Sequence, residues 1–360
     1  MRVAFISRAS MHNLPGGDTV QMQETARALS ALGVEVELFA SSDAIDYGRF
    51  DLLHFFNIIR PADILVHQQR SGLPSVVSTI FVEYHEYDRT MRGGLSGKLA
   101  RVLGPHQMEY LKAVGRHWRN GEKIQSAEYW RIGQAAAIRK AASNAAMLLP
   151  NSHSEYQRFR AAFGADVPYK VVTNAIDPER FGVAPSVERE ANRVLCVGKI
   201  EGIKNQLNLI RAVKDLPVPL VLVGKPVPNQ PEYLARCNQE AGSNVRFVDH
   251  MPQDELVNEY ARAAVHVLPS WFETTGLSSL EAAALGCRLV ISNRGDAPEY
   301  FQDYAHMCEP DKVASIRTAI QQALAAPANN ELREKVLAEH TWAIAAAQTL
   351  EAYKNVLSSR

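Results

Sequence analysis

Residues 270–287 read SWFETTGLSSLEAAALGC, and this stretch decides how the rest of the chain is interpreted. The apolar run at 265–268 before it is typical of a buried strand, and apolar residues recur at helical spacing from Gly276 onward. Glu273 lies before this predicted helix, and Glu281 lies within its first turns. A strand, a short polar turn and a helix in this order form one unit of a parallel sheet covered by helices.

The same alternation of strand and helix extends along the whole chain. Short apolar runs predict strands at residues 2–6, 34–38, 52–56, 75–79, 146–150, 170–173, 193–197, 219–223, 244–247, 265–268 and 288–291. Strands that alternate with helices form parallel sheets buried on both faces. We therefore predict an α/β protein with two Rossmann-like, doubly wound parallel-sheet domains that face a central cleft.

The length of 360 residues also favours two domains, at about 150 residues each. We place the first at residues 1–168, with a helical, basic insertion at 85–145, and the second at 169–339. No strand follows the predicted helix within residues 340–360, so we expect that helix to cross the domain boundary.

Composition excludes some classes of protein and favours one compartment. Lys+Arg and Asp+Glu both total 39, and this balance does not favour nucleic-acid binding. The four cysteines lack metal-ligand spacing, which is typical of buried thiols in a reducing compartment. The N-terminus has no signal-peptide pattern, and no apolar run approaches the ~18 residues of a membrane span. We therefore expect a cytoplasmic protein.

The two glutamates suit a ligand that combines phosphate and sugar groups. Free backbone N–H groups at the start of the predicted helix favour an anion such as phosphate. A carboxylate accepts hydrogen bonds from paired sugar hydroxyls. Glu273 and Glu281 on either side of such an anion would fit a sugar–diphosphate–nucleoside. The spacing alone is equally compatible with a Glu273 that complements the helix dipole and a solvated Glu281.

A pair of lysines strengthens the first interpretation. Lys199 and Lys204 both follow a predicted strand that ends at Gly198. As cations in the cleft they would neutralise a leaving diphosphate, which gains negative charge as the bond to the sugar breaks. The alternative for both is a solvated position on the surface.

With these residues, the sequence resembles the retaining family 4 glycosyltransferases, or glycosyl transferases group 1, whose fold is called GT-B. The main motif is a glutamate, seven residues and a second glutamate, followed by small residues and a glycine; here it runs from Glu273 through Glu281 to Gly286. Other segments resemble the family in the same chain order: the glycine loop at 15–17, the serine segment at 151–154, the segment at 173–181, the basic pair within 197–205 and the strand end at 222–224.

The resemblance implies a role for individual residues. It implies that Glu273 contacts the transferred sugar, that Glu281 contacts the ribose, and that Lys199 and Lys204 hold the diphosphate. The catalytic candidates are Glu273, Lys204, Lys199 and His85. The candidates for nucleotide-sugar binding are Gly16, Gly17, Gly198, Lys199, Lys204, Gly224, His250, Met251, Glu273, Thr275, Gly276, Leu277, Ser278 and Glu281. The family usually has Arg at the position of Lys199, and Lys cannot form the bidentate fork of Arg.

The first half departs from the family pattern at one position. Many members have a His after the strand that corresponds to residues 75–79, and here that position falls on Phe81 or Val82. His85 follows a few residues later and is either a substitute or an ordinary loop histidine; Glu83 is another candidate. His54 and Asn57, at the end of the strand at 52–56, are further residues that could face the cleft.

Residues 89–140 form a basic segment. They contain eleven Lys and Arg and three Glu, a difference of +8, with Tyr110, Trp118, Tyr129 and Trp130 interleaved. Basic residues with aromatics can rest on an anionic membrane surface or bind a lipid-linked diphosphate acceptor. The alternative is a solvated helical hairpin whose aromatic residues pack inward.

We therefore predict a retaining hexosyltransferase that transfers a hexose from a GDP- or UDP-linked sugar to a hydroxyl of a glycan or lipid-linked acceptor. The resemblance favours bacterial surface polysaccharide synthesis, with peripheral contact of residues 89–140 at the inner membrane. We expect no cofactor and no metal, since no Asp-x-Asp motif lies in a suitable loop. Two alternatives are a non-catalytic nucleotide-sugar-binding protein and a nucleotide-sugar epimerase or phosphorylase on the same fold.

Overall fold

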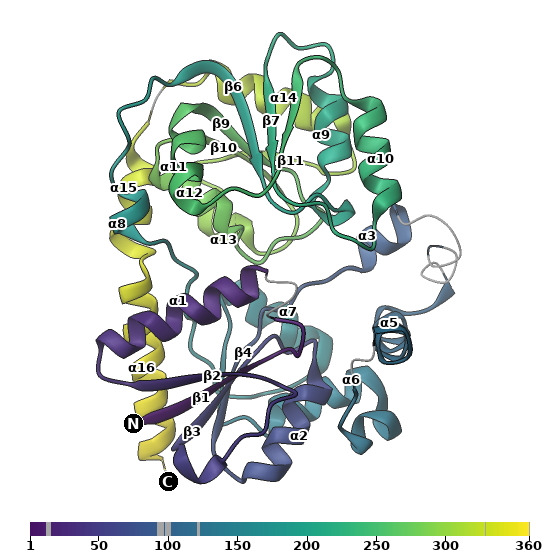
Figure 1. The fold of residues 1–360 in the computed structure, drawn as a ribbon, viewed down its shortest axis with the longest axis vertical. Helices are drawn as coiled ribbons and strands as arrows, with labels where there is room; N and C mark the ends of the chain where they lie inside the picture. The colour runs from purple at the N-terminus through teal and green to yellow at the C-terminus, as the bar shows by residue number, and fades with distance from the viewer. Residues whose placement is uncertain (12–15, 92–96, 98–101, 121–122, 328, 360) are drawn as a thin grey trace. The chain divides into compact units, whose positions relative to one another are not determined.

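The chain folds into two compact units, each built on one parallel sheet (Figure 1). The computed structural model describes residues 1–11, 16–91, 97, 102–120, 123–327 and 329–359, without the side chains of residues 119 and 120. Pro15 of the glycine loop and Arg92, Lys98, Arg101 and Glu122 of the basic segment lie outside the described residues. The first unit comprises Met1–Val82, Gly94–Asn174 and Trp342–Arg360, and the second comprises Glu83–Gly93 and Ala175–Thr341.

The sheet of the first unit has five parallel strands in the order β2-β1-β3-β4-β5. Their bounds are Arg2–Ser7 for β1, Glu35–Ala40 for β2, Leu52–Phe56 for β3, Ser75–Ser78 for β4 and Met147–Leu149 for β5. The chain moves from β1 to β2 on one side and then returns to β3 on the other. The topological switch point of this sheet therefore lies between β1 and β3, where doubly wound sheets bind their ligands.

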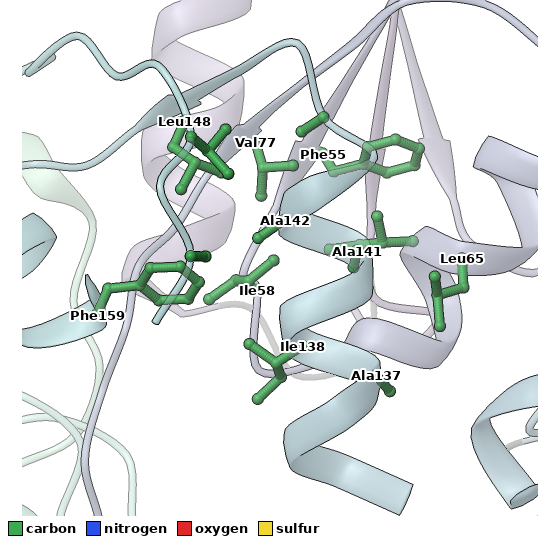
Figure 2. Packing of buried hydrophobic residues seen from close by; sticks show 14 of the residues in the cluster. Phe55, Ile58, Leu65, Val77, Ala137, Ile138, Ala141, Ala142, Leu148 and Phe159 are labelled. Carbon is green, nitrogen blue, oxygen red and sulfur yellow. The ribbon is translucent and has the colours of Figure 1, made fainter. Parts of the chain in front are cut away.

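Helices cover both faces of this sheet. They are α1 (Gly17–Ala31), α2 (Pro61–Ser71), α5 (Pro105–Asn120), α6 (Ala127–Ser143), α7 (His153–Phe163) and α16 (Trp342–Ser358), with a short η1 at Tyr47–Arg49. Figure 2 shows the core on one face, where Ala137, Ile138 and Ala141 of α6 pack against Leu65 of α2 and Phe55 of β3. The final helix α16 packs against α1 within the same unit (Figure 1).

The second unit contains six parallel strands in the order β11-β10-β9-β6-β7-β8. Their bounds are Glu190–Val197 for β6, Leu220–Val223 for β7, Val245–Val248 for β8, Ala263–Leu268 for β9, Arg288–Ser292 for β10 and His306–Cys308 for β11. The chain proceeds from β6 to β7 and β8 on one side, then crosses back to β9 on the other. The switch point of this sheet therefore lies between β6 and β9.

The second sheet is also buried on both faces. Its helices are α3 (His85–Thr90), α8 (Pro178–Phe181), η2 (Gly202–Lys204), α9 (Gln206–Val213), α10 (Pro231–Glu240), α11 (Gln253–Arg262), α12 (Leu277–Ala284), α13 (Ala297–Phe301), α14 (Val313–Ala325) and α15 (Glu331–Glu339). In β6, Leu195 belongs to one apolar cluster and Val194 and Cys196 to the other. Side chains of a strand alternate between faces, so a continuous apolar run is expected when both faces are covered.

The structure corrects two strand predictions. Residues 170–173 do not open the second sheet; Lys170 N and Val172 N donate to Leu148 O at 3.0 Å and Pro150 O at 2.9 Å, so this segment runs along the edge of the first sheet. Proline at residue 168 precedes it, and no regular strand forms. In contrast, β11 was not predicted, because His306–Cys308 is short and not continuously apolar.

Two further expectations bear on the boundaries and the membrane. Glu83–Gly93, which we expected in the first domain, cluster with the second unit, and α16 begins where the chain re-enters the first unit. Within the part of the chain that the structure describes, no helix combines the length and hydropathy needed to cross a bilayer.

Candidate functional site

The candidate site of the second unit lies at the switch point of its sheet. The loop after β6 carries Lys199 and Lys204, and the loop after β9 carries Glu273. Because β6 and β9 are parallel neighbours, their carboxyl ends lie at the same edge of the sheet. Lys204 and Glu273, 69 positions apart in the sequence, therefore meet at this edge, as expected for a parallel sheet of this fold.

Lys204 and Glu273 form an ion pair at the centre of this edge. Lys204 Nζ donates to Glu273 Oε1 at 2.5 Å, and Ser270 Oγ donates to the same oxygen at 2.7 Å. Burial alone would lower the pKa of Lys204, but the carboxylates of Glu273 and Glu201 outweigh burial and the pKa is raised. Lys204 is therefore held as a cation in a largely desolvated place, where a charge acts most strongly on a ligand.

Lys199 lies beside the same group of charges. Burial raises the pKa of Glu201, and the positive charges of Lys204 and Lys199 oppose that rise. Gln206 Nε2 donates to the backbone oxygen of Lys199 at 2.8 Å, which holds the strand end in place. Lys199 is partly exposed, and the structure thus places a second cation near the Lys204–Glu273 pair.

Gly224 lets the ends of β6 and β7 approach closely. Gly224 has φ +149°, and a Cβ at that position would lie 2.1 Å from the backbone oxygen of Gly198. The side chain of Lys204 passes over Gly198, with its Cδ 3.9 Å from where a Cβ would lie. Gly224 is therefore required by the close approach of the Gly198 backbone, whereas a side chain at Gly198 would make only ordinary van der Waals contact with Lys204.

The backbone of Glu273 is held by a turn that sequence reasoning did not identify. Asp296 N donates to Glu273 O at 2.7 Å. Gly295 has φ +78°, and a Cβ there would lie 2.2 Å from Glu273 O and 2.8 Å from Glu273 N. The loop after β10 therefore positions Glu273 from a third strand end. Its turn residues, 293–298, directly follow a predicted strand, and this was the signal available in the sequence.

Helix α12 (Leu277–Ala284) begins four residues after Glu273. Gly276 precedes it with φ +81°, and no side chain among the described residues caps its N-terminus. Leu277 and Ser278 are the first two helical residues, so their backbone N–H groups precede the intrahelical hydrogen-bond ladder. Thr275 is buried beside them. This arrangement suits an anion at the end of the helix.

Glu281 lies one turn into α12 and contacts a tyrosine. Tyr260 Oη donates to Glu281 Oε2 at 2.7 Å. Burial raises the pKa of Glu281 to about 7, although the hydrogen bond from Tyr260 and the charge of Arg180 oppose the rise. Tyr260 was not predicted, because it belongs to α11 and nothing in its local sequence marks it. The pair provides a partly buried carboxyl group that can accept a further hydrogen bond.

We expect this raised pKa to appear in the pH dependence of stability. Between about pH 4.5 and pH 7 folded Glu281 keeps a proton that the unfolded chain releases, so the free energy of unfolding falls as pH rises. The Glu281→Gln variant lacks this titration. In urea denaturation, the free energy of unfolding of the variant relative to the wild type should rise by about 1–3 kcal/mol between about pH 4.5 and pH 7. A difference between the two proteins that does not change with pH would contradict this prediction.

The two residues predicted to border the base lie after β8. Met251 packs against the apolar cluster that also receives Leu277, Val197 and Val248. His250 is exposed, and its backbone N–H donates to Asp249 Oδ1 at 2.6 Å. The structure therefore packs Met251 against the core of the second unit and leaves the His250 side chain in solvent.

The glycine loop belongs to the first unit. Gly16 is the N-cap residue of α1, and Gly17 is exposed. Beside them, Arg8 and Asp18 form a bidentate ion pair, with Nε–Oδ2 at 2.7 Å and a second contact, from the other Arg8 nitrogen to Oδ1, at 3.1 Å. Burial alone would raise the pKa of Asp18, but Arg8 lowers it overall. Sequence reasoning missed this pair, which fixes the start of α1.

His85 lies on α3, in the same unit as Glu273. It is exposed, while its neighbours hold α3 in place: Glu86 Oε1 lies 3.2 Å from Arg294 Nε, and Tyr87 Oη occupies the space beside Gly202. A Cβ on Gly202 would lie 1.8 Å from that hydroxyl oxygen. Glu83 precedes α3 and is partly exposed. A catalytic role for His85 stays a prediction.

The other candidates in the first unit have structural environments. Phe81, one of the two residues at which the family His was expected, is buried against Phe159 and Phe163, and its backbone N–H donates to Glu155 Oε1 at 2.7 Å. Val82 follows it and is partly buried. The loop after β4 is therefore part of the core packing.

His54 does not face solvent at the strand end. It is buried, with Nδ1 at 2.6 Å from Tyr353 Oη and Nε2 at 2.9 Å from Ser78 Oγ. Burial lowers its pKa to about 3, so the ring is neutral and joins β3 to α16 and β4. Asn57 follows β3 with φ 78° and shapes the turn.

The comparisons with known proteins agree with this geometry. Residues 183–339 match the family described as glycosyl transferases group 1. The D-inositol 3-phosphate glycosyltransferase of Corynebacterium glutamicum is 26% identical over 348 residues, covering 83% of this chain and 82% of that protein. The O-antigen chain mannosyltransferase B of Escherichia coli is 30% identical over 173 residues, covering 44% of this chain and 45% of that protein.

Solved structures show the same fold. Sucrose-phosphate synthase from Thermosynechococcus elongatus matches with a TM-score of 0.77 at 19% identity, and the match covers 100% of both chains. Two parallel sheets of five and six strands are the GT-B arrangement that the sequence predicted. Residues 183–339 therefore match the glycosyl transferases group 1 family, the chain has the GT-B fold, and it is a retaining hexosyltransferase that uses a nucleotide-sugar donor.

Proposed function

We propose that this enzyme transfers a hexose from a GDP- or UDP-linked donor to a hydroxyl of a glycan or lipid-linked acceptor, in bacterial surface polysaccharide synthesis. The main support for a nucleotide-sugar donor is the Lys204–Glu273 pair at the switch point of the second sheet. The N-terminus of α12, which no described side chain caps, follows a few residues after Glu273. Cation, carboxylate and helix terminus together suit a sugar–diphosphate.

Each group then has a distinct role. Lys204 and Lys199 neutralise the diphosphate, and the backbone N–H groups of Leu277 and Ser278 bind its oxygens. Glu273 accepts hydrogen bonds from the transferred sugar. Glu281 accepts hydrogen bonds from the ribose, and that contact favours its ionised form. We expect the transfer to need no metal ion, because Lys204, Lys199 and the start of α12 supply the positive charge.

Retention follows from attack on the face that the diphosphate leaves. The bond between the sugar and the diphosphate oxygen breaks, and the acceptor oxygen forms its bond on the same face. The leaving diphosphate oxygen receives the proton of the acceptor hydroxyl. No enzymic nucleophile is required by this route, and Lys204 stabilises the charge that develops on the leaving group.

Two observations support an acceptor at a membrane surface. The name of the E. coli relative refers to the O-antigen chain, a surface polysaccharide. On α5, Leu111 and Trp118 are 45% and 77% exposed, and they lie seven residues apart on one face of the helix. Tyr129, by contrast, is buried. An exposed apolar stripe within a basic segment suits peripheral binding to the cytoplasmic face of an anionic membrane.

Thermal stabilisation by nucleotides tests the donor site. We expect GDP or UDP, without metal, to raise the melting temperature; at ~100 times Kd the stabilisation is ~2.7 kcal/mol. The Lys204→Gln variant should lose most of the shift. Lys312→Gln is the matched control, because Lys312 also pairs with a glutamate, Glu309 at 2.6 Å, but on the surface. The same nucleotide shift in all three proteins, or no shift in the wild type, would refute this assignment.

A further inference from the structure

The first unit contains a small pocket that the donor chemistry does not use. Its lining includes Ala9, Arg60, Asp63, Arg116, Lys123 and Gln134, and its volume is about 40 Å³. Ala9 follows β1, and Arg60 follows β3. The pocket therefore lies at the topological switch point of the first sheet, where a doubly wound sheet places its ligand.

The charge of the pocket favours an anion. Arg60, Arg116 and Lys123 contribute three positive charges against one negative charge from Asp63, a difference of +2. Arg60 is also the N-cap residue of α2, which has eleven residues, so the positive end of this helix dipole adds to the same field. The positive groups come from three places in the chain: the loop after β3, α5 and the segment before α6.

One wall of the pocket is preformed. Tyr129 Oη donates to Gln134 Oε1 at 2.7 Å, and Gln134 Nε2 donates to Ile59 O at 2.9 Å. Tyr129 and Gln134 are 1% and 5% exposed. Burial and the nearby Glu109 carboxylate raise the pKa of Tyr129, while the charges of Arg116 and Arg60 oppose that rise, so both guanidinium groups lie near this wall. A polar wall fixed in this way lowers the entropy cost of binding a ligand.

The size of the pocket limits what it can hold. A volume of about 40 Å³ has room for about three water-sized spheres, since each needs roughly 10–15 Å³. That space is enough for one phosphoryl group. The remainder of such a ligand would extend out of the pocket.

We propose that this pocket binds a phosphate group of the acceptor, so that the acceptor is a phosphorylated sugar or a lipid-linked sugar diphosphate. The proposal rests on the proposed function, because it assigns the pocket to the acceptor of the transfer. The phosphate binds Arg116, Lys123 and Arg60 and leaves the sugar hydroxyl outside the pocket. Charge-assisted hydrogen bonds of this kind are the strongest that a protein offers to an anion.

The test uses the whole enzyme with its donor site filled. The stabilising nucleoside diphosphate is added at saturation, and inorganic phosphate is then titrated at constant ionic strength against a chloride control. The melting temperature of the wild type should rise with phosphate. In Arg116→Gln/Lys123→Gln, the apparent affinity for phosphate should be about tenfold weaker or worse.

The matched control removes two charges from the same helical hairpin outside the pocket. Arg131→Gln/Lys140→Gln removes the two cations that pair with Glu128. This variant should respond to phosphate as the wild type does. If the Arg116→Gln/Lys123→Gln protein does not fold, Lys123→Gln alone is compared with Lys140→Gln, since both lysines are exposed.

The outcomes separate this inference from the donor assignment. A normal nucleotide shift in Arg116→Gln/Lys123→Gln with a lost phosphate response supports the pocket. A nucleotide shift without any phosphate response in the wild type, or with equal responses in all variants, overturns the pocket and leaves the proposed function standing. Two further probes distinguish the source of the phosphate: glucose 1-phosphate represents a soluble acceptor, and farnesyl diphosphate represents a lipid-linked one. The one that competes with phosphate identifies the class.

Discussion

The Glu273→Gln variant should lose at least about 10²-fold in kcat while it still binds the nucleoside diphosphate within about threefold of the wild type. Glutamine keeps the size of the side chain and one hydrogen-bond acceptor, but it removes the negative charge. Glu273 accepts from both Lys204 and Ser270, so its oxygen is already aligned before a ligand binds. A nucleoside diphosphate carries no transferred sugar, and its affinity should therefore not depend on this carboxylate.

The control for this variant is Glu309→Gln. Glu309 Oε2 pairs with Lys312 Nζ at 2.6 Å, so the substitution breaks a comparable ion pair at the surface. Its kcat should equal that of the wild type. Initial rates with donor and acceptor, together with melting temperatures, check both variants. A Glu273→Gln enzyme that turns over within threefold of the wild type would reduce Glu273 to a structural partner of Lys204.

Local patterns in the sequence predicted most of the second sheet and the start of α12. The strand at 265–268, the polar turn and the small residues after Gly276 are all encoded within a few residues of one another. Continuous apolar runs identified β6, β7 and β9, because helices cover both faces of the sheet. The meeting of Lys204 with Glu273 also follows from parallel topology, since both residues follow neighbouring strands.

The contacts that complete the site depend on tertiary structure and leave little local signal. Tyr260 belongs to a different helix from Glu281, and only the packing of α11 against α12 brings its hydroxyl to the carboxyl group. Gly295 looks like an ordinary turn glycine in the sequence. Its requirement arises because the backbone of Glu273 occupies the space of a side chain at that position.

In the first unit, some residues that looked functional in the sequence turned out to have structural partners far away in the chain. His54 stands at the end of a strand, where a polar residue is often functional, but its partner Tyr353 lies 299 positions later in the chain. No pattern near residue 54 could reveal that partner. Phe81, one of the two residues at which the family His was expected, likewise packs against Phe159 and Phe163, which lie much later in the chain.

Gly295→Ala should damage both stability and catalysis. The residue has φ +78°, a backbone conformation that costs an L-residue about 1 kcal/mol, and the added Cβ would also lie 2.2 Å from Glu273 O. The nearest atoms belong to the backbone, so no side chain can rotate to relieve the contact. The loop must shift, and the hydrogen bond from Asp296 N to Glu273 O is strained or lost. We expect a destabilisation of about 3 kcal/mol or more and at least a tenfold fall in kcat.

Gly33→Ala separates the two causes. Gly33 has φ +80°, almost the same as Gly295, but nothing lies within 4 Å of its added Cβ. The free energy of unfolding of this variant should therefore fall only by the cost of the backbone conformation, about 1 kcal/mol, and kcat should not change. Urea denaturation and initial rates on both variants measure the difference. Equal losses of stability in the two proteins, or full activity in Gly295→Ala, would mean that the loop after β10 yields to the methyl group and does not position Glu273.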